Sequence, residues 1–254
     1  MTLTRWQGFH SGQEVVPINP TRTTTQQSPQ AAALWAGTSS VRLRAALAAG
    51  TAPDPALLET LVERCAAEPD FFVRDMLSWA LTRLPRQAVL PRIREELGSA
   101  HPQARSQALH TLSKINDRTT WAWITDALLR DPDDETARTA WRTAVLLVPD
   151  GEEENLAAEL ARQLGRGDRD VRLSLSRALA GLGEAASPAL ERAAKSPDPE
   201  TAAHARATEI LRKDPQTGFE AAVEAAKREA SLGPQYAATV TAAAATRTPG
   251  TTDR

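Results

Sequence analysis

Apolar residues between about 30 and 232 recur three and four positions apart, as on one face of a helix. Clusters of proline, glycine and aspartate interrupt this pattern every dozen residues or so. No window alternates apolar and polar residues in the way that a half-buried strand does. The pattern predicts an all-α protein, built from short helices that tight turns connect.

The pattern repeats, because an arginine that follows valine or alanine returns every 31 to 34 residues. These arginines are Arg42, Arg74, Arg105, Arg138 and Arg172. The residues three and seven positions after each arginine are alanine, leucine, valine or tryptophan, and these offsets share one helix face. Four residues before the last four arginines stand Asp70, His101, Asp134 and Asp168, where an aspartate is expected to cap the coming helix.

Each repeat therefore predicts a first helix, a turn with aspartate or proline, and a second helix that the arginine opens. The predicted units are about 31–52, 53–85, 86–117, 118–150, 151–184 and 185–214, and a last helix at about 217–231 closes the series. In the sixth unit Ala203 stands where the arginine is expected. Terminal repeats often deviate, since one of their faces meets solvent.

Segments such as Leu128–Leu147 and Gly165–Gly183 resemble HEAT repeats, of the short type named after phycobilisome lyases. The resemblance covers about 40–214 and consists of an acidic turn, a Val-Arg or Ala-Arg pair, and a helix rich in small apolar residues. It implies a right-handed α-solenoid of about six HEAT-like helical hairpins, whose second helices line a concave face. It implies no single function, because such repeats serve scaffolds, bilin lyases, a protein hydroxylase and DNA glycosylases.

The two ends of the chain differ from the repeats. Residues 1–28 are polar and without period, which predicts a flexible or loosely docked arm. Residues 233–254 end in Thr-Pro-Gly-Thr-Thr and predict a disordered tail. The solenoid is expected to occupy 29–232.

Composition narrows the classes of function. Of the 254 residues, 47 are alanine and 4% are aromatic, which favours helix over sheet. A net charge of -2 gives no basic footprint for nucleic acid, so no nucleic-acid partner is expected. No apolar run is long enough for a membrane span or a signal peptide, so we expect a cytoplasmic protein without membrane contact.

Catalytic and metal chemistry find little support in the sequence. The histidines (His10, His101, His110 and His204) form no His-Glu or His-x-x-x-His pair, so no metal site is expected. The single cysteine, Cys65, lies among leucines and is expected to be a buried structural thiol. No phosphate-binding glycine loop or nucleophile motif occurs. We therefore expect no catalytic residue and no cofactor.

The opening arginines allow two interpretations. Repetition at one offset favours a structural role, in which each arginine pairs with the acidic turn of its own or a neighbouring unit. The alternative is a row of arginines that binds a ligand.

A binding groove is predicted from the side of the second helices that faces away from the core. That side carries Ser, Thr, His, Trp and Arg where an unpartnered surface usually carries Glu and Lys, and Trp and Arg dominate binding interfaces. The candidate residues are Asp75, Trp79, Arg83, Ser106, His110, Lys114, Thr139, Arg142 and Arg177. The alternative is close packing between successive second helices, which also favours small residues.

Trp121 and Trp123 form a second aromatic feature, on a predicted first helix where Trp123 is expected to face the core. With Asp126 they loosely resemble the residues with which alkyl-base DNA glycosylases of this repeat class grip a base. Acidic clusters at 131–135 and 150–154 speak against nucleic acid.

The sequence thus favours a non-enzymatic HEAT-repeat scaffold or adaptor that binds a protein or peptide partner through its concave face. The alternative is an accessory or catalytic HEAT-like subunit, similar to a bilin lyase or to an alkylpurine DNA glycosylase.

Overall fold

The computed structural model describes residues 28–214 and 218–232. Within these residues all regular structure is helical, with thirteen α-helices, three 3-10 helices and no strand. The all-α prediction is confirmed. The predicted tail at 233–254 and the predicted arm, except for Ser28, lie outside the described residues.

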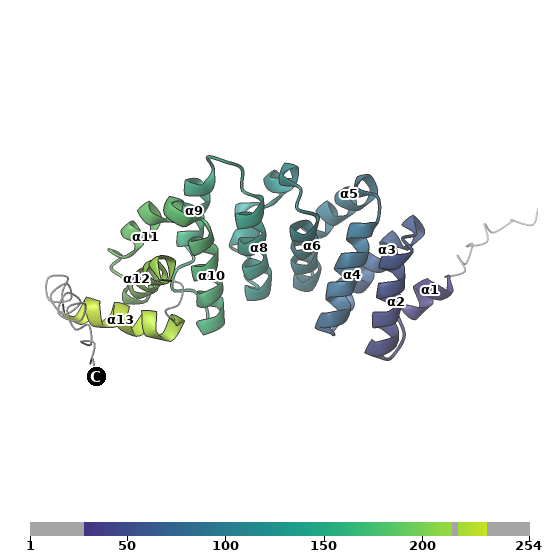
Figure 1. Cartoon of the computed structure of the whole chain (residues 1–254), viewed down its shortest axis with the longest axis horizontal. Coiled ribbons are helices and arrows are strands. Elements are labelled where there is room, and N and C mark those ends of the chain that lie inside the picture. The colour runs from purple at the N-terminus through teal and green to yellow at the C-terminus, as the bar shows by residue number, and fades with distance from the viewer. Residues whose placement is uncertain (1–27, 215–217, 233–254) are drawn as a thin grey trace, which may run out of the picture.

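Six long helices lie side by side in chain order, and each contacts the next (Figure 1). They are α2 (Ser39–Thr51), α4 (Phe71–Arg83), α6 (Pro102–Ile115), α8 (Asp134–Leu147), α10 (Arg169–Gly181) and α12 (Pro199–Lys213). The row is long and bowed, with its two ends lower than its middle in Figure 1.

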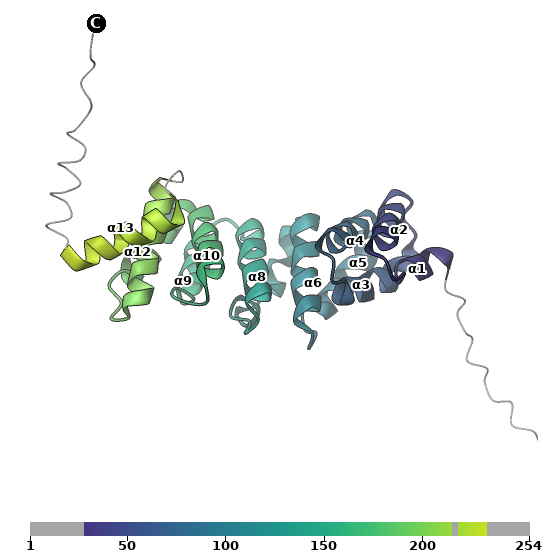
Figure 2. The same ribbon diagram turned by 90° about the horizontal axis from the view of Figure 1, so that it is seen from below.

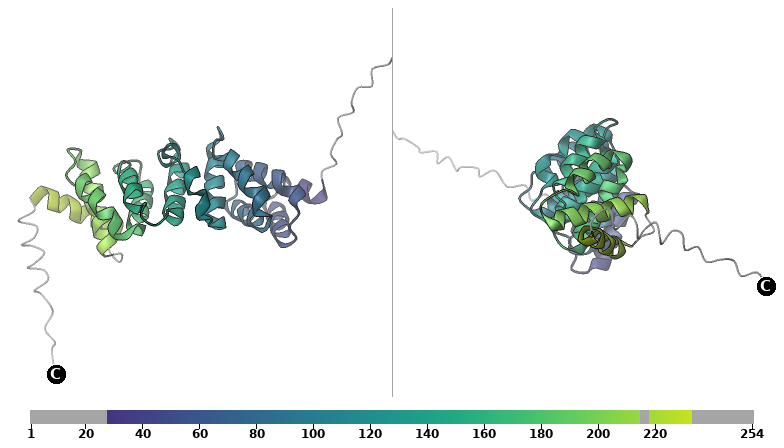
Figure 3. Two further views of the ribbon diagram at one scale, coloured as in Figure 1. Left: turned by 90° about the horizontal axis from the view of Figure 1, so that it is seen from above. Right: turned by 90° about the vertical axis from the view of Figure 1, so that its left-hand side faces the viewer.

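Shorter helices connect the long ones and pack behind them (Figures 1 and 2). They are α1 (Pro29–Ala33), η1 (Pro55–Leu57), α3 (Leu58–Ala67), α5 (Arg86–Glu96), η2 (Arg118–Trp123), α7 (Asp126–Leu129), α9 (Glu153–Ala161), η3 (Gly183–Ala186) and α11 (Ser187–Ala193). At the far end α13 (Phe219–Leu232) packs on α12 and crosses the row, as the end-on view of Figure 3 shows.

One continuous apolar core runs from Ala31 to Ala205. The side chain three positions after each opening arginine is buried, as the repeat predicts. The largest of these side chains is the fully buried Trp141, whose indole N–H donates to the Leu129 carbonyl at 2.8 Å. Seven positions after, burial is complete or nearly so except at Val145, which is only partly buried. These apolar side chains fill the space between neighbouring helices.

The predicted helix caps are confirmed at Asp70 and Asp168. Each carboxylate accepts hydrogen bonds from two backbone N–H groups of the helix that it begins. In the fourth unit Asp133, not Asp134, is the cap, and Asp134 is the first helical residue. As a result Arg138 is the fifth residue of α8, whereas the other opening arginines are fourth in their helices.

The opening arginines mostly tie adjacent turns together, which is the structural role predicted for them. Arg42 reaches Glu68 in the next turn at 2.7 Å, and Arg105 reaches Asp131 at 2.7 Å. The same guanidinium groups also donate to carbonyls of their own preceding turn, such as that of Ser99. Each of these arginines therefore holds its own turn and the following one.

Of the other three arginines, Arg172 repeats this arrangement with an exposed acid, whereas Arg74 and Arg138 depart from it. Arg172 bonds the Gly167 carbonyl and pairs with the exposed Glu200. Arg74 donates only to turn carbonyls, because glycine, serine and alanine stand where the next turn would supply an acid. Arg138 pairs only with Glu135 of its own helix. Its shift by one residue turns the side chain by about 100° relative to the preceding turn.

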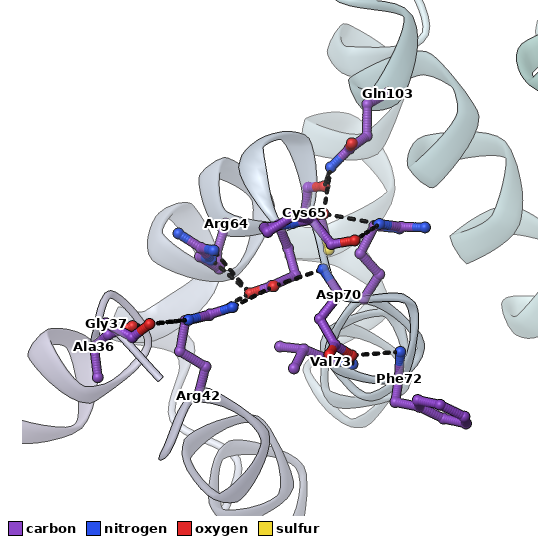
Figure 4. A network of polar contacts seen from close by, with 12 residues as sticks. Ala36, Gly37, Arg42, Arg64, Cys65, Asp70, Phe72, Val73 and Gln103 are labelled. Atoms are coloured by element: carbon purple, nitrogen blue, oxygen red, sulfur yellow. Dashed lines mark hydrogen bonds and ion pairs between the residues drawn. The ribbon is translucent and has the colours of Figure 1, made fainter. Parts of the chain in front are cut away.

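The tightest of these networks joins Arg42, Arg64 and Asp70 (Figure 4), and the hydrogen bonds place Glu68 at its centre. It is fully buried and accepts hydrogen bonds from Arg42, Arg64 and the backbone N–H of Asp70. Burial acts to raise the pKa of this carboxyl, but the hydrogen bonds from Arg42, Asp70 and Arg64 outweigh it and lower the pKa to about 2. Glu68 therefore stays ionised and joins α2, α3 and α4.

Replacing Glu68 by glutamine should destabilise the fold strongly, because it leaves two buried arginines without their carboxylate. We expect a loss of about 3–5 kcal/mol in the free energy of unfolding, measured by urea denaturation. Glu200→Gln is the matched control, because Glu200 is exposed, and its loss should stay below about 1 kcal/mol. Equal losses in the two variants would show that the Glu68 network does not hold the stack.

His204 forms a second buried network, at the other end of the row. Its Nδ1 accepts the N–H of Gly165 at 3.0 Å, so the ring proton is on Nε2, which faces the Ser176 hydroxyl and the Arg172 carbonyl. Phe219 of α13 packs against the ring edge to face. Burial lowers the pKa of His204 to about 4, so the ring is neutral at physiological pH.

The neutral His204 predicts a loss of stability in mild acid. The unfolded chain takes up this proton near pH 6.5 but the folded chain only near pH 4, so the contribution is complete above pH 6.5 and falls between these values. The fall should amount to at most roughly 3 kcal/mol. The His204→Gln variant should be less stable at pH 7, and its free energy of unfolding should change less between pH 6.5 and pH 4. Chemical denaturation at each pH measures both proteins. Parallel profiles for the two proteins would contradict the buried neutral histidine.

Candidate functional site

A groove of about 420 Å³ crosses the N-terminal halves of α4, α6 and α8. All of its lining residues belong to these three helices or to the turn before α8. They include Phe71, Arg74, Asp75, Gln103, Ser106, His110, Asp133, Glu135, Thr139 and Arg142. Five of the nine predicted groove residues are among them, namely Asp75, Ser106, His110, Thr139 and Arg142. We call it the α4–α8 groove.

Asp75 links α4 to α6 on one wall of the groove. Its carboxylate lies 3.0 Å from the Lys114 ammonium and 3.1 Å from His110 Nε2. Burial lowers the pKa of His110, although Asp75 acts to raise it, so the imidazole is neutral near pH 7. Burial acts to raise the pKa of Asp75, but Lys114 and His110 outweigh it, and the carboxylate stays charged. Lys114 does not line the groove but contacts this wall through its ion pair with Asp75.

Ser106 and Thr139 lie between α6 and α8, with their hydroxyls 3.1 Å apart, and both are buried. They act mainly as small packing residues, which was the alternative interpretation of the polar side. Arg142 donates to the Thr139 hydroxyl at 3.1 Å, but its side chain is 58% exposed. The floor of the groove is therefore a helix contact, and Arg142 stands at its edge.

Three predicted residues lie elsewhere. Trp79 packs its ring on α2, where a Cβ added at Gly50 would fall 2.0 Å from the ring, and it does not line the α4–α8 groove. Arg83 is exposed at the opposite end of α4, and Arg177 is exposed on α10. Helical offset alone places these side chains outside the core, but it does not bring them to one surface.

The most exposed aromatic residues of the described chain were not predicted from the sequence. Phe71 and Phe72, the first residues of α4, are 64% and 71% exposed, and their rings contact edge to face. Phe71 lines the groove, and the Arg74 guanidinium lies 5.9 Å from its ring centre. A Phe-Phe pair directly after a capping aspartate was the available signal, in a chain with four phenylalanines.

The Trp121–Trp123 segment is a 3-10 helix and not the regular first helix that was predicted. Both tryptophans are half-buried and pack against the core, so Trp123 is not alone in doing so. Arg94 covers the Trp123 ring at 5.2 Å, and Asp126 pairs with Arg130. The Trp123 ring and the Asp126 carboxylate, which a base-gripping site would need, are therefore already in contact with Arg94 and Arg130.

Reactive groups are scarce in the described part of the chain. Cys65 is buried, as predicted, and burial raises the pKa of its thiol to about 12, which leaves it protonated. Residues 28–214 and 218–232 contain no group of three or more His, Cys, Asp or Glu side chains placed to hold a metal ion. Among the helices described, none has the length and apolar character that crossing a bilayer requires.

Comparison with known proteins adds no family to this picture. No protein-family model matches the chain, and no curated protein is significantly similar to it.

The packing of Trp79 can be tested at the glycine that it covers. Gly50→Ala should cost about 1–3 kcal/mol in the free energy of unfolding, because the added methyl group collides with the ring. Gly37→Ala is the control, since no atom lies within 4 Å of its added Cβ, and its stability should be unchanged or slightly higher. Thermal denaturation of both variants measures the difference. An unaffected Gly50→Ala variant would show that Trp79 is instead a free surface residue.

Proposed function

We propose that this chain is a non-enzymatic adaptor or scaffold, a right-handed α-solenoid of about six HEAT-like hairpins that binds a protein or peptide partner. The α4–α8 groove is the proposed binding site, on the concave face that the second helices line. The repeat of the opening arginine and the ordered contacts between successive long helices support this assignment.

The observation that carries the proposal is the composition of the groove. It combines an exposed aromatic side chain, Phe71, with the exposed cation of Arg142 on a floor of closely packed helices. Aromatic residues and arginine supply most of the binding energy at protein interfaces. A rigid floor lowers the entropic cost of ordering the site when a partner binds.

Photo-cross-linking tests this site even where the partner has not been identified. Replacing Phe71 by the photoreactive analogue benzoylphenylalanine keeps an aromatic ring at the groove, and illumination in a lysate of the source cells should give one recurrent cross-linked protein. The same analogue at Leu146, which is exposed but outside the groove, is the control position.

Charge reversal gives the matched pair of variants. Arg142→Glu should reduce the cross-link from position 71 at least about tenfold, whereas Arg177→Glu, on α10, should leave it unchanged. Urea denaturation of both variants shows whether they fold. Equal cross-linking from positions 71 and 146, or equal effects of the two reversals, would contradict the groove as the binding site.

A further inference from the structure

The two arginines of the α4–α8 groove are weakly paired: Arg142 makes one long ion pair, and Arg74 donates to backbone carbonyls. The carboxylate nearest to Arg142 is that of Glu135, at 3.9 Å, and the guanidinium is mostly exposed. Arg74 donates to the carbonyls of Glu68 and Pro69, which are uncharged acceptors. Both positive charges are therefore available to a ligand at little desolvation cost to an existing ion pair.

The acids of the groove are, in contrast, already engaged. Asp75 is held by Lys114 and His110. Asp133 caps α8 through the N–H and the hydroxyl of Thr136. Glu135 pairs at 3.3 Å with Arg138, which does not line the groove, and lies 3.9 Å from Arg142. A cationic ligand would have to displace these partners, whereas an anionic one would not.

The N-terminus of α6 adds to this asymmetry. The helix has fourteen residues, its first turn contains no acid, and His101 at its cap position makes no side-chain hydrogen bond to it. Its partial positive charge is therefore not offset by a side chain, as it is in α4 and α8. The first helical residues, Pro102 and Gln103, line the groove.

Phe71 supplies the apolar part of the same surface. It lines the groove while Arg74 lies near the face of its ring, and Phe72 extends the exposed aromatic surface next to it. An apolar ligand side chain placed on this pair would bring neighbouring ligand groups near Arg74.

From these contacts we propose that the α4–α8 groove binds an acidic peptide segment with an apolar anchor, its carboxylates at Arg74 and Arg142 and its apolar side chain on Phe71 and Phe72. The proposal rests on the proposed function and specifies its ligand. A peptide is favoured over nucleic acid, which is also anionic, because Asp133 and Glu135 flank Arg142 and would repel a continuous phosphate backbone.

Defined synthetic probes test the ligand class on the full chain. Four fluorescein-labelled peptides share a neutral flexible frame: one carries leucine between aspartates, one has asparagine for each aspartate, one has lysine for each aspartate, and one has alanine for leucine. A labelled single-stranded oligothymidylate forms the fifth arm. Fluorescence anisotropy at low and high NaCl measures binding.

The acidic leucine peptide should bind at least about tenfold more tightly than the asparagine, lysine and alanine peptides, and NaCl should weaken it. Arg142→Glu should reduce this affinity about tenfold and improve binding of the lysine peptide. Phe71→Ala should remove the preference for leucine over alanine, and Arg177→Glu should change nothing. Rescue by Arg142→Lys distinguishes a need for positive charge from a structural effect.

Preference for the lysine or asparagine peptide, or tighter binding of the oligothymidylate, would overturn the ligand class. Acidic-peptide binding that survives both Arg142→Glu and Phe71→Ala would overturn the placement. In either case a partner that still cross-links from position 71 and is lost in Arg142→Glu leaves the proposed function standing. If the cross-link fails but the peptide preference is intact, the proposed function as an adaptor is contradicted, while the proposed ligand class of the groove stands.

Discussion

The bond from an opening arginine to the acid of the next turn is the interaction on which this arrangement depends. In a row of short helices each unit touches only its neighbours, so small changes of angle between units add up along the row. Apolar packing holds neighbours together but is not directional. The Arg42–Glu68 and Arg105–Asp131 pairs are bidentate, with both carboxylates buried, and they fix one turn against the next. Arg42 and Arg105 also bond their own turn, so each determines the position of two helices.

The turn before α4, which contains Glu68 and Asp70, positions one side of the α4–α8 groove. Glu68 accepts the N–H of Asp70, and Asp70 in turn accepts the N–H groups of Phe72 and Val73, so a chain of short bonds runs from the buried arginines to the start of α4. Arg74 bonds the carbonyls of the same turn. The backbone of Phe71 is therefore positioned by hydrogen bonds of this turn and not by burial of its ring, which stays exposed, and the partly buried Arg74 is held by carbonyls of the same turn.

Local rules account for what the sequence predicted correctly. Helix starts at Asp70 and Asp168, the burial of Trp141 and the pairing of Arg42 and Arg105 with an acidic turn all depend on spacing within a unit or between adjacent ones. The groove was predicted only in part. The offset of a residue along its helix shows whether the side chain faces the core, but it does not show whether a side chain outside the core faces solvent or a neighbouring helix. Ser106 and Thr139 face each other across a close contact, a result of the distance between α6 and α8 that no single helix encodes.

The same limit explains why the sequence singled out Trp79 of α4, whereas Phe71 is the aromatic residue that lines the α4–α8 groove. Trp79 lies at a polar offset, yet the absence of a side chain at Gly50 on α2 opens a slot that its ring fills, and this depends on two residues distant in sequence. Phe71 precedes the periodic apolar positions of α4, so the periodicity makes no prediction about its exposure. A single exposed apolar side chain needs no explanation, but a contiguous exposed pair beside Arg74 and the mostly exposed Arg142 does. Burying these rings in the core would stabilise the chain by about 1.5–3 kcal/mol each. Stability alone therefore does not favour this arrangement, which the proposed binding role of the groove would explain.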